Sequence, residues 1–341
     1  MLHSVNKGRM NLQQRKELLV RLGRYIISDD GGWKDAKLKA TAENPWFIPE
    51  FIDLAINNIA ENFLQPDHLQ ALVDRYQVPS ENPEPFTIGI VMAGNVPLVG
   101  FHDLLCVFLS GHKAMIKASS KDLALISQVI KMMIQWEPAA SEYLAISERI
   151  PNCDAYIATG SNNSSRYFEY YFRKYPSIIR KNRTSVAILT GRESGEELEK
   201  LADDVYQHFG LGCRNVTQLY LPRQYDFLPL LNAFKKYDHL IEFNKYKNNY
   251  DYNLALHILN NTYYMTNGSI ILIENPSPFS PISQLHYQYY SDRAELENSL
   301  LQNESIQCIV SNSAIPFGAA QCPAISDYAD GIDTMKFLMN L

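Results

Sequence analysis

Apolar residues recur at helical spacing along the first quarter of the chain. Residues 11–76 follow this pattern, and the pair Gly31-Gly32 interrupts it. Two further amphipathic segments cover residues 49–64 and 66–76. The sequence therefore predicts a group of N-terminal helices that ends before a polar, proline-rich loop at residues 79–85.

From Phe86 onward, short apolar runs alternate with amphipathic segments. The runs predict strands at 86–92, 113–117 and 155–158, and the segments predict helices at 98–109, 123–136 and 164–172. This alternation predicts an α/β fold with a mainly parallel sheet. Ligands of such sheets bind beyond the carboxyl ends of the strands. The turns that follow the three strands are therefore candidate ligand sites.

A second α/β unit begins near Ser185. Its elements are predicted as strands at 186–189, 216–221, 270–273, 283–290 and 306–310, and helices at 196–208 and 293–301. The later part of this unit is looser, with a Tyr/Asn-rich segment at residues 245–253 followed by a predicted helix. These patterns predict domains at 1–183 (N-terminal helices and cofactor binding) and 184–317 (catalysis), and leave the membership of 318–341 open.

Composition narrows the class of protein. The chain has 341 residues, of which 46% are hydrophobic and 20% charged, and this suits a two-domain globular protein. The net charge of -6 argues against a nucleic-acid binder. The five cysteines are widely spaced, without metal-ligand spacing, and no secretion signal precedes them, so we expect a reduced cytoplasmic protein without a metal site. No apolar run reaches transmembrane length.

One stretch of the second unit carries a candidate nucleophile. In Phe209-Gly210-Leu211-Gly212-Cys213, two glycines closely precede a single cysteine, and an apolar run follows after a polar pair. Glycines permit close approach of a substrate, and a cysteine on such a loop can act as a nucleophile. A free cysteine is also commonly a small buried side chain, so these residues alone leave both interpretations open. His208 invites a Cys–His pair, but its side chain need not reach the loop if the preceding helix continues to it.

Three turns of the first unit carry polar residues suited to substrate or nucleotide contacts. Asn95 lies in the first turn, where its amide could stabilise an oxyanion or merely suit the turn. Lys117, Ser119 and Ser120 lie between a strand and a helix, where ribose or phosphate contacts are common, although Ser119 could instead cap the helix. The run Thr159-Gly160-Ser161 opens another helix and could receive a phosphate.

A basic cluster stands out in this acidic protein. It comprises Arg173, Lys174, Arg180, Lys181 and Arg183. Such a run is usually a solvated face, but it could also hold the phosphates of coenzyme A or of a dinucleotide.

Six stretches in order along the chain carry a family resemblance. They are Asn44-Pro45-Trp46-Phe47, Gly94-Asn95-Val96-Pro97-Leu98, DAYIATGSNNSSRYFEYYF from Asp154, RKNRTSVAILTG from Arg180, FGLGCRNV from Phe209, and FGAAQCPAISDYADGIDTMKFL from Phe317. Together they resemble the aldehyde dehydrogenase superfamily, and within it the acyl-CoA reductase family that includes the reductase subunit of bacterial bioluminescence. The resemblance implies a Rossmann-like cofactor domain, an α/β catalytic domain and N-terminal helices.

The resemblance also implies roles for particular residues. Cys213 matches the nucleophile of the superfamily, and Asn95 matches its oxyanion-stabilising asparagine. Lys117 matches the lysine that holds the adenosine ribose, and Gly160-Ser161 the pair near the cofactor pyrophosphate. Phe279-Ser280-Pro281 resembles the Phe-Gly-Pro segment near the nicotinamide.

The departures from the superfamily pattern are informative. Ser120 replaces a glutamate that would repel a 2′-phosphate, which favours NADPH over NADH. The catalytic glutamate expected before the RTSVAIL strand has no counterpart among residues 179–182, so hydrolysis of an acyl-enzyme should be slow. Ser277 stands where a glutamate of the superfamily grips the nicotinamide ribose, so this chain lacks that carboxylate. The oligomerisation hairpin expected before Phe86 and the C-terminal extension are missing, which favours a monomer or weak oligomer.

The family implies reduction of a long-chain acyl-CoA to the aldehyde, with NADPH as cofactor and release of coenzyme A. An acyl-transferring or acyl-activating protein is a possible partner. Two alternatives stay open: a reductase of an acyl phosphate or acyl-protein thioester, and a catalytically silent relative that binds a nucleotide or a partner protein.

Overall fold

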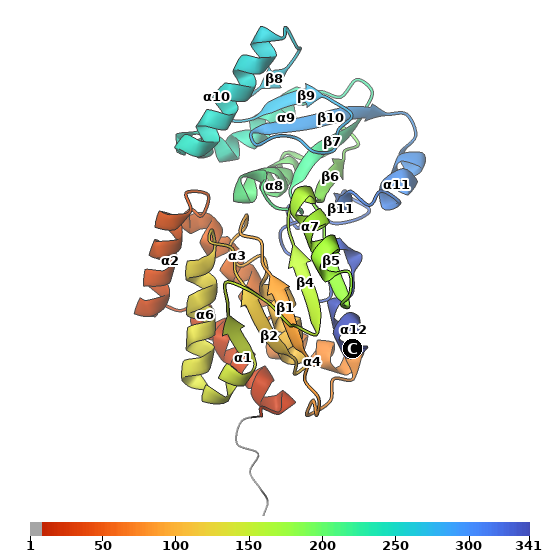
Figure 1. Ribbon diagram of the computed structural model, residues 1–341. Helices are drawn as coiled ribbons and strands as arrows, with labels where there is room; N and C mark the ends of the chain where they lie inside the picture. The colour runs from red at the N-terminus through yellow and green to blue at the C-terminus, as the bar shows by residue number, and fades with distance from the viewer. Residues whose placement is uncertain (1–8) are drawn as a thin grey trace, which may run out of the picture. The chain divides into compact units, whose positions relative to one another are not determined.

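The computed structural model describes residues 9–341 and divides into two compact units. The first unit is Met1–Lys181 together with Pro323–Leu341, and the second is Asn182–Cys322. The chain thus leaves the first unit, completes the second and returns. In Figure 1 the blue C-terminal helix α12 (Thr334–Met339) lies beside elements of the first unit, where it packs on α4 (Pro66–Tyr76) and α5 (Phe101–Leu109).

The first unit is built on a five-stranded sheet in the order β3-β2-β1-β4-β5, with every pairing parallel. The strands are β1 (Thr87–Val91), β2 (Lys113–Lys117), β3 (Leu144–Ile146), β4 (Ala155–Thr159) and β5 (Ser177–Arg180). The chain runs outward from β1 to β2 and β3, then crosses back to β4 on the other side. The order therefore reverses between β1 and β4, which is where open parallel sheets bind ligands.

Helices precede and connect these strands. Besides α4, α5 and α12, they are α1 (Leu12–Ile26), α2 (Gly31–Glu43), α3 (Pro49–Asn62), α6 (Leu123–Trp136) and α7 (Asn162–Phe172). The start of α1 is fixed by a capping box, in which Asn11 accepts the N–H of Gln14 and Gln14 accepts that of Asn11, both at 2.9 Å. The N-terminal helices expected from the sequence are confirmed.

The second unit contains a six-stranded mixed sheet in the order β11-β6-β7-β10-β9-β8. Only the short edge strand β8 is antiparallel to its neighbour. The strands are β6 (Thr184–Ile188), β7 (Val216–Pro222), β8 (Met265–Thr266), β9 (Ile271–Glu274), β10 (Gln284–Tyr290) and β11 (Ile306–Val310). The helices are α8 (Gly195–Tyr206), α9 (Phe227–Ala233), α10 (Asn244–Leu259) and α11 (Arg293–Leu301). Together the two sheets confirm the predicted α/β fold.

Three sequence expectations are wrong in detail. Gly31-Gly32 begins α2, capped by Asp30. The helix expected from residue 98 begins at Phe101, because Leu98 has a left-handed backbone with φ of 54°. The Tyr/Asn-rich residues 245–253, expected to precede a helix, lie inside α10, whose buried face is made of Tyr246, Tyr250 and Asn253. Polar and aromatic side chains form this face, so the helical period is invisible to a count of aliphatic residues.

In residues 9–341, no helix has the length and apolar character that crossing a membrane requires.

A buried ion pair fastens the returning C-terminal segment to the first unit. The guanidinium of Arg180, at the end of β5, is 3% exposed and lies 2.6 Å from the Asp103 carboxylate on α5. It also donates to the Ala329 carbonyl at 2.5 Å and to Thr334 Oγ1 at 2.8 Å. Burial by itself would raise the pKa of Asp103, but the charge and hydrogen bond of Arg180 lower it overall.

We expect Arg180→Ala to lower the free energy of unfolding of the first unit by about 3–5 kcal/mol, because it strands the Asp103 carboxylate. The three tryptophans, Trp33, Trp46 and Trp136, all belong to this unit, so their fluorescence in a urea titration reports its unfolding. The contribution is present at neutral pH and disappears as the pH falls through the lowered folded-state pKa of Asp103, below the ordinary 3.8.

Lys34→Ala is the matched control. It removes an exposed pair with Asp29 in the same unit and should leave the urea midpoint almost unchanged. Equal midpoints for wild type and Arg180→Ala would contradict the role assigned to the buried pair.

Candidate active site

The cysteine loop follows an unusual backbone reversal. After α8 ends at Tyr206, three consecutive residues adopt left-handed conformations: His208 (φ 54°), Phe209 (φ 56°) and Gly210 (φ 72°). Two of these residues are not glycine, so surrounding contacts must hold this conformation. The Phe209 ring is 2% exposed and packs against Phe243 and Tyr246. This buried ring anchors the loop that leads to Cys213.

Buried polar side chains fix the backbone on both sides of Cys213. Asn215 is fully buried, and its Oδ1 accepts the N–H of Gly212 at 2.8 Å. Its Nδ2 donates to the carbonyls of Gln207 at 2.8 Å and Asp204 at 3.1 Å. Ser185 Oγ donates to the carbonyl of Cys213 itself at 3.0 Å. The loop is therefore rigidly held although it contains no regular structure, while the Cys213 side chain stays half-buried.

The segment that begins at Phe317 is tied to the same loop. Arg214 Nε donates to the Ala320 carbonyl at 2.6 Å. The Asp204 carboxyl accepts the N–H groups of Gly318 at 2.7 Å and Ala320 at 2.9 Å. Burial raises the pKa of Asp204 to about 7, and the two N–H groups only partly offset this effect. Sequence reasoning did not single out Asp204, Ser185 or Asn215, because each acts through a backbone contact that no spacing reveals.

His208 does not supply a positive charge near the loop. Its imidazole is 4% exposed, and burial lowers its pKa to about 4. The ring is therefore neutral at pH 7, and a neutral ring cannot stabilise a thiolate by its charge.

Phe279 lies in a loop next to the start of β7. Ser277 organises this loop, since its hydroxyl donates to the Phe279 carbonyl at 3.2 Å and accepts the Phe279 N–H at 3.3 Å. Thr217 Oγ1, near the start of β7, donates to the Pro278 carbonyl. The second unit thus holds the Phe279 loop and the strand that follows Cys213 against each other.

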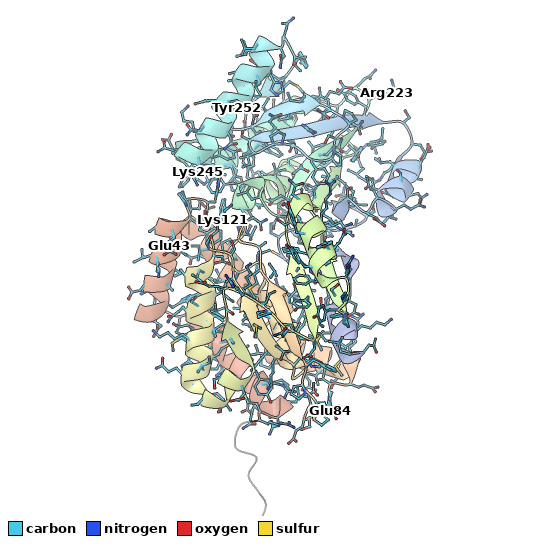
Figure 2. The ribbon with its side chains drawn as sticks, viewed as in Figure 1. Glu43, Glu84, Lys121, Arg223, Lys245 and Tyr252 are labelled. Carbon is cyan, nitrogen blue, oxygen red and sulfur yellow. The ribbon has the colours of Figure 1, made fainter. Side chains whose placement is uncertain are left out.

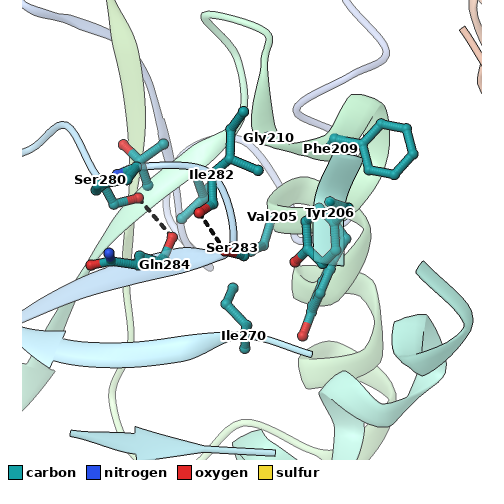
Figure 3. Close-up of a pocket in the computed structure, with 13 residues that line it drawn as sticks. Val205, Tyr206, Phe209, Gly210, Ile270, Ser280, Ile282, Ser283 and Gln284 are labelled. Carbon is teal, nitrogen blue, oxygen red and sulfur yellow. Dashed lines mark hydrogen bonds between the residues drawn. The ribbon is translucent and has the colours of Figure 1, made fainter. Parts of the chain in front are cut away.

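A small cavity lies between the backbone reversal at Phe209-Gly210 and the loop that follows Phe279 (Figure 3). Its lining includes Phe209, Gly210, Thr217, Ser280, Ile282 and Gln284. The cavity measures about 20 Å³, which is room for about one water molecule. It is too small for an acyl chain.

The first unit gathers its candidate residues at one edge of its sheet. Lys117 ends β2, Thr159 ends β4, and Asn95 follows β1, which lies between these two strands. Because the strands are parallel, their carboxyl ends and the loops that follow lie at the same edge. The two loops after β1 and β2 touch: a Cβ on Gly94 would lie 2.6 Å from Ser119 Oγ. Only glycine fits this approach.

Two of the hydroxyl groups at this edge, those of Ser119 and Ser161, have local partners. Asp122, and not Ser119, occupies the N-cap position of α6. The Ser119 hydroxyl accepts the Lys121 N–H at 3.3 Å. Ser161 caps α7 by accepting the Ser164 N–H at 3.3 Å. Asn95, Lys117 and Ser120 are exposed at the surface of the unit.

One member of the basic cluster is not available to a phosphate. The Arg180 guanidinium is buried in its ion pair with Asp103, so it cannot hold a ligand. Lys181 pairs with Glu169 at 2.9 Å, and the Arg173 guanidinium lies 5.1 Å from the centre of the Tyr170 ring.

Neither a protein-family model nor a curated protein sequence matches the chain. Solved structures do match it. Aldehyde dehydrogenase 21 from Physcomitrella patens, in complex with the reaction product succinate, matches with a TM-score of 0.66 and 11% identity, over 98% of this chain and 85% of that one. The indole-3-acetaldehyde dehydrogenase AldA of P. syringae, in complex with NAD+ and IAA, matches with a TM-score of 0.65 and 13% identity, over 93% of this chain and 76% of that one.

A Mycobacterium tuberculosis aldehyde dehydrogenase complexed with NAD+ gives a TM-score of 0.59 and 12% identity, over 84% of this chain and 70% of that one. At such low identities the likeness is one of backbone arrangement. The chain has the aldehyde dehydrogenase fold.

Proposed function

We propose that this protein reduces a long-chain acyl-CoA to the aldehyde with NADPH, through an acyl-thioester on Cys213. The observation that carries the proposal is the state of this cysteine. Cys106, Cys153 and Cys308 are buried, whereas Cys213 is half-buried on a loop whose backbone is pinned on both sides. A nucleophile needs both this access and this fixed position.

The edge of the first sheet supports dinucleotide binding. Gly94 lets the loops after β1 and β2 approach closely beside the reversal of strand order, and the exposed Lys117 makes no ion pair with the described residues. The proposal assigns the adenosine ribose to Lys117, with Ser119 and Ser120 beside it. It assigns the pyrophosphate to Thr159-Gly160-Ser161, at the start of α7, because helix N-termini attract phosphate. NAD+ is present in the matching structures of P. syringae AldA and of the M. tuberculosis aldehyde dehydrogenase.

The proposed chemistry begins with attack of the Cys213 thiolate on the thioester carbonyl carbon. Asn95 Nδ2 and the Cys213 N–H stabilise the resulting oxyanion, each good donor contributing roughly 3 kcal/mol. The carbon–sulfur bond to coenzyme A then breaks, and coenzyme A leaves as a thiol after taking up a proton. Bound NADPH supplies the hydride that reduces the acyl carbon. Collapse of the resulting hemithioacetal oxyanion returns the Cys213 thiolate and frees the aldehyde. The proposal places Phe279 beside the nicotinamide.

The residues before β6 support acyl transfer over hydrolysis. Activation of water would need a general base, but Ile179, Arg180 and Lys181 provide no carboxylate, and Arg180 is held by Asp103. An acyl group on Cys213 should therefore survive until hydride arrives.

Incubation with a long-chain acyl-CoA in the absence of NADPH should add one acyl group to the intact protein, as measured by mass spectrometry. The label should map to Cys213 and be absent from Cys213→Ala, which should also consume no NADPH. Cys322→Ala removes the exposed cysteine and should leave both activities unchanged.

An intact wild type that binds nucleotide but takes no label from acyl-CoA, acyl phosphate or an acyl-protein would indicate the catalytically silent relative. Label from one of the last two donors alone would indicate the alternative reductase. NADPH turnover unchanged in Cys213→Ala would refute the mechanism.

Asn95→Ala should slow acylation of Cys213 by about 100- to 1,000-fold, because it removes one oxyanion donor. Single-turnover release of coenzyme A measures this rate. Asn57→Ala, an exposed change on α3, is the control and should have no effect. A loss of less than about threefold in Asn95→Ala would argue against its assigned role.

Ser120→Glu should shift the ratio of NADPH to NADH affinity toward NADH by about tenfold or more, because a carboxylate binds a 2′-hydroxyl and repels a 2′-phosphate. Titration calorimetry with each cofactor measures the ratio. Ser120→Gln has the same length without the charge and should leave the ratio nearly unchanged. Equal shifts in the two variants would place the 2′-phosphate elsewhere.

A further inference from the structure

Asp122 occupies the N-cap position of α6, but its side chain does not cap that helix. An aspartate at this position commonly accepts an N–H from the first turn of its own helix. Here Oδ2 instead accepts the N–H of Leu98 at 2.7 Å, in the turn that follows β1 and carries Asn95. The side chain is only 6% exposed. Asp122 therefore joins the loop after β2 to the turn after β1.

The turn after β1 needs such an external contact. Leu98 has a φ of 54°, in the left-handed region that a leucine occupies only when its surroundings hold it there. Its side chain is 3% exposed, and its carbonyl accepts the Phe101 N–H at 2.9 Å. Asp122 binds the remaining backbone polar group of this strained residue, so it holds the conformation of the turn from outside.

The loop that carries Asp122 is itself fixed. The buried Asn44 donates from Nδ2 to the Lys121 carbonyl at 3.2 Å. Lys121 precedes Asp122 in the sequence, and Glu43 precedes Asn44. Figure 2 shows Lys121 and Glu43 close together on the surface of the first unit. Ser119, which lies in the same loop as Asp122, packs against Gly94 in the turn after β1. Asp122 thus holds the turn of Asn95 against a loop that cannot easily follow it.

Burial favours the neutral, protonated form of the Asp122 carboxyl. Its Oδ1 is buried and has no hydrogen-bond partner among the described residues. Burial raises the pKa of Asp122 to about 8, although the Leu98 N–H opposes the rise. No charged side chain contributes to the shift: neither Lys117 and Lys121 of its own loop, nor His102 and Asp103 of α5, Lys131 of α6, or Glu43 at the end of α2, which packs on α6. At pH 7 the group is therefore a carboxylic acid that accepts one N–H.

We propose that Asp122 is the positioning residue for Asn95. By binding the N–H of Leu98 it fixes the turn from which the Asn95 amide is presented. The role of Asn95 in stabilising an oxyanion rests on the proposed function, whereas the restraint of the turn does not. Asp122→Asn keeps a neutral acceptor of the same shape and should preserve the restraint, and Asp122→Ala should remove it.

Amide hydrogen exchange tests the restraint without any substrate. In Asp122→Ala, the peptide covering residues 93–100 should exchange about tenfold faster or more, because the Leu98 N–H loses its acceptor. Asp154→Ala is the matched control: Asp154 accepts the Thr87 N–H, also at 2.7 Å, at the opposite end of β1. It should leave the exchange of residues 93–100 unchanged. Equal exchange in wild type and Asp122→Ala would overturn the proposal.

Acylation kinetics test the link to Asn95. At pH 7, Asp122→Ala should acylate Cys213 about tenfold more slowly or worse, and Asp122→Asn should stay within about threefold of wild type. The ratio of wild-type to Asp122→Asn rates cancels the ionisation of the cysteine. Opening of the turn would hydrate the Asp122 carboxyl and let it ionise, so this ratio should fall as the pH rises toward about 8 and level off above it. A ratio that stays flat to pH 10, or an Asp122→Ala rate equal to wild type, would overturn the assignment.

The two readouts separate failures of the two proposals. A wild type that takes no acyl label refutes the proposed function, yet hydrogen exchange still decides the role of Asp122. If Asp122→Ala does not fold, the comparison passes to wild type and Asp122→Asn at pH 9. There residues 93–100 of wild type should exchange faster than those of the amide variant, and equal exchange would overturn the restraint.

Discussion

A guanidinium buried inside a protein needs partners where it lies, and the partners of Arg180 join distant parts of the first unit. Arg180 ends the last strand of the sheet, and its partners come from three places: Asp103 on α5, Ala329 in the returning segment and Thr334 at the start of α12. The charge pair therefore joins parts of the chain that no local pattern connects. The residues just before β6 thus serve the packing of the first unit.

Buried polar side chains likewise hold the irregular loops of the candidate site. Backbone groups outside helices and strands need partners, and buried amide, hydroxyl and carboxyl side chains provide them. Asn215 and Ser185 fix the Cys213 loop, and Asp122 fixes the turn of Asn95. In each case the side chain with the proposed chemistry is exposed or half-buried, while the residue that fixes its backbone is buried. Reactivity and rigidity are thus supplied by different residues.

The sequence predicted the strands and helices with clear apolar periods, and α6 and α11 match their expected bounds. It failed where the buried face is polar, as in α10, and where backbone strain ends an apolar run, as at Leu98. Asn95, Lys117 and Thr159 could be assigned to one sheet edge because parallel strands bring their carboxyl ends together. The supporting residues Asn215 and Asp122 could not be foreseen, since their backbone partners depend on the fold.

The discontinuity of the first unit has a consequence for synthesis. Residues 323–341, which supply Ala329 and Thr334 to Arg180, leave the ribosome only after the whole second unit. The N-terminal unit is therefore made first but completed last, against the usual order in which domains mature. Until then α4 and α5 lack the helix that packs on them. The nascent chain carries this uncovered apolar surface throughout the synthesis of the second unit, and it is a natural target for chaperones.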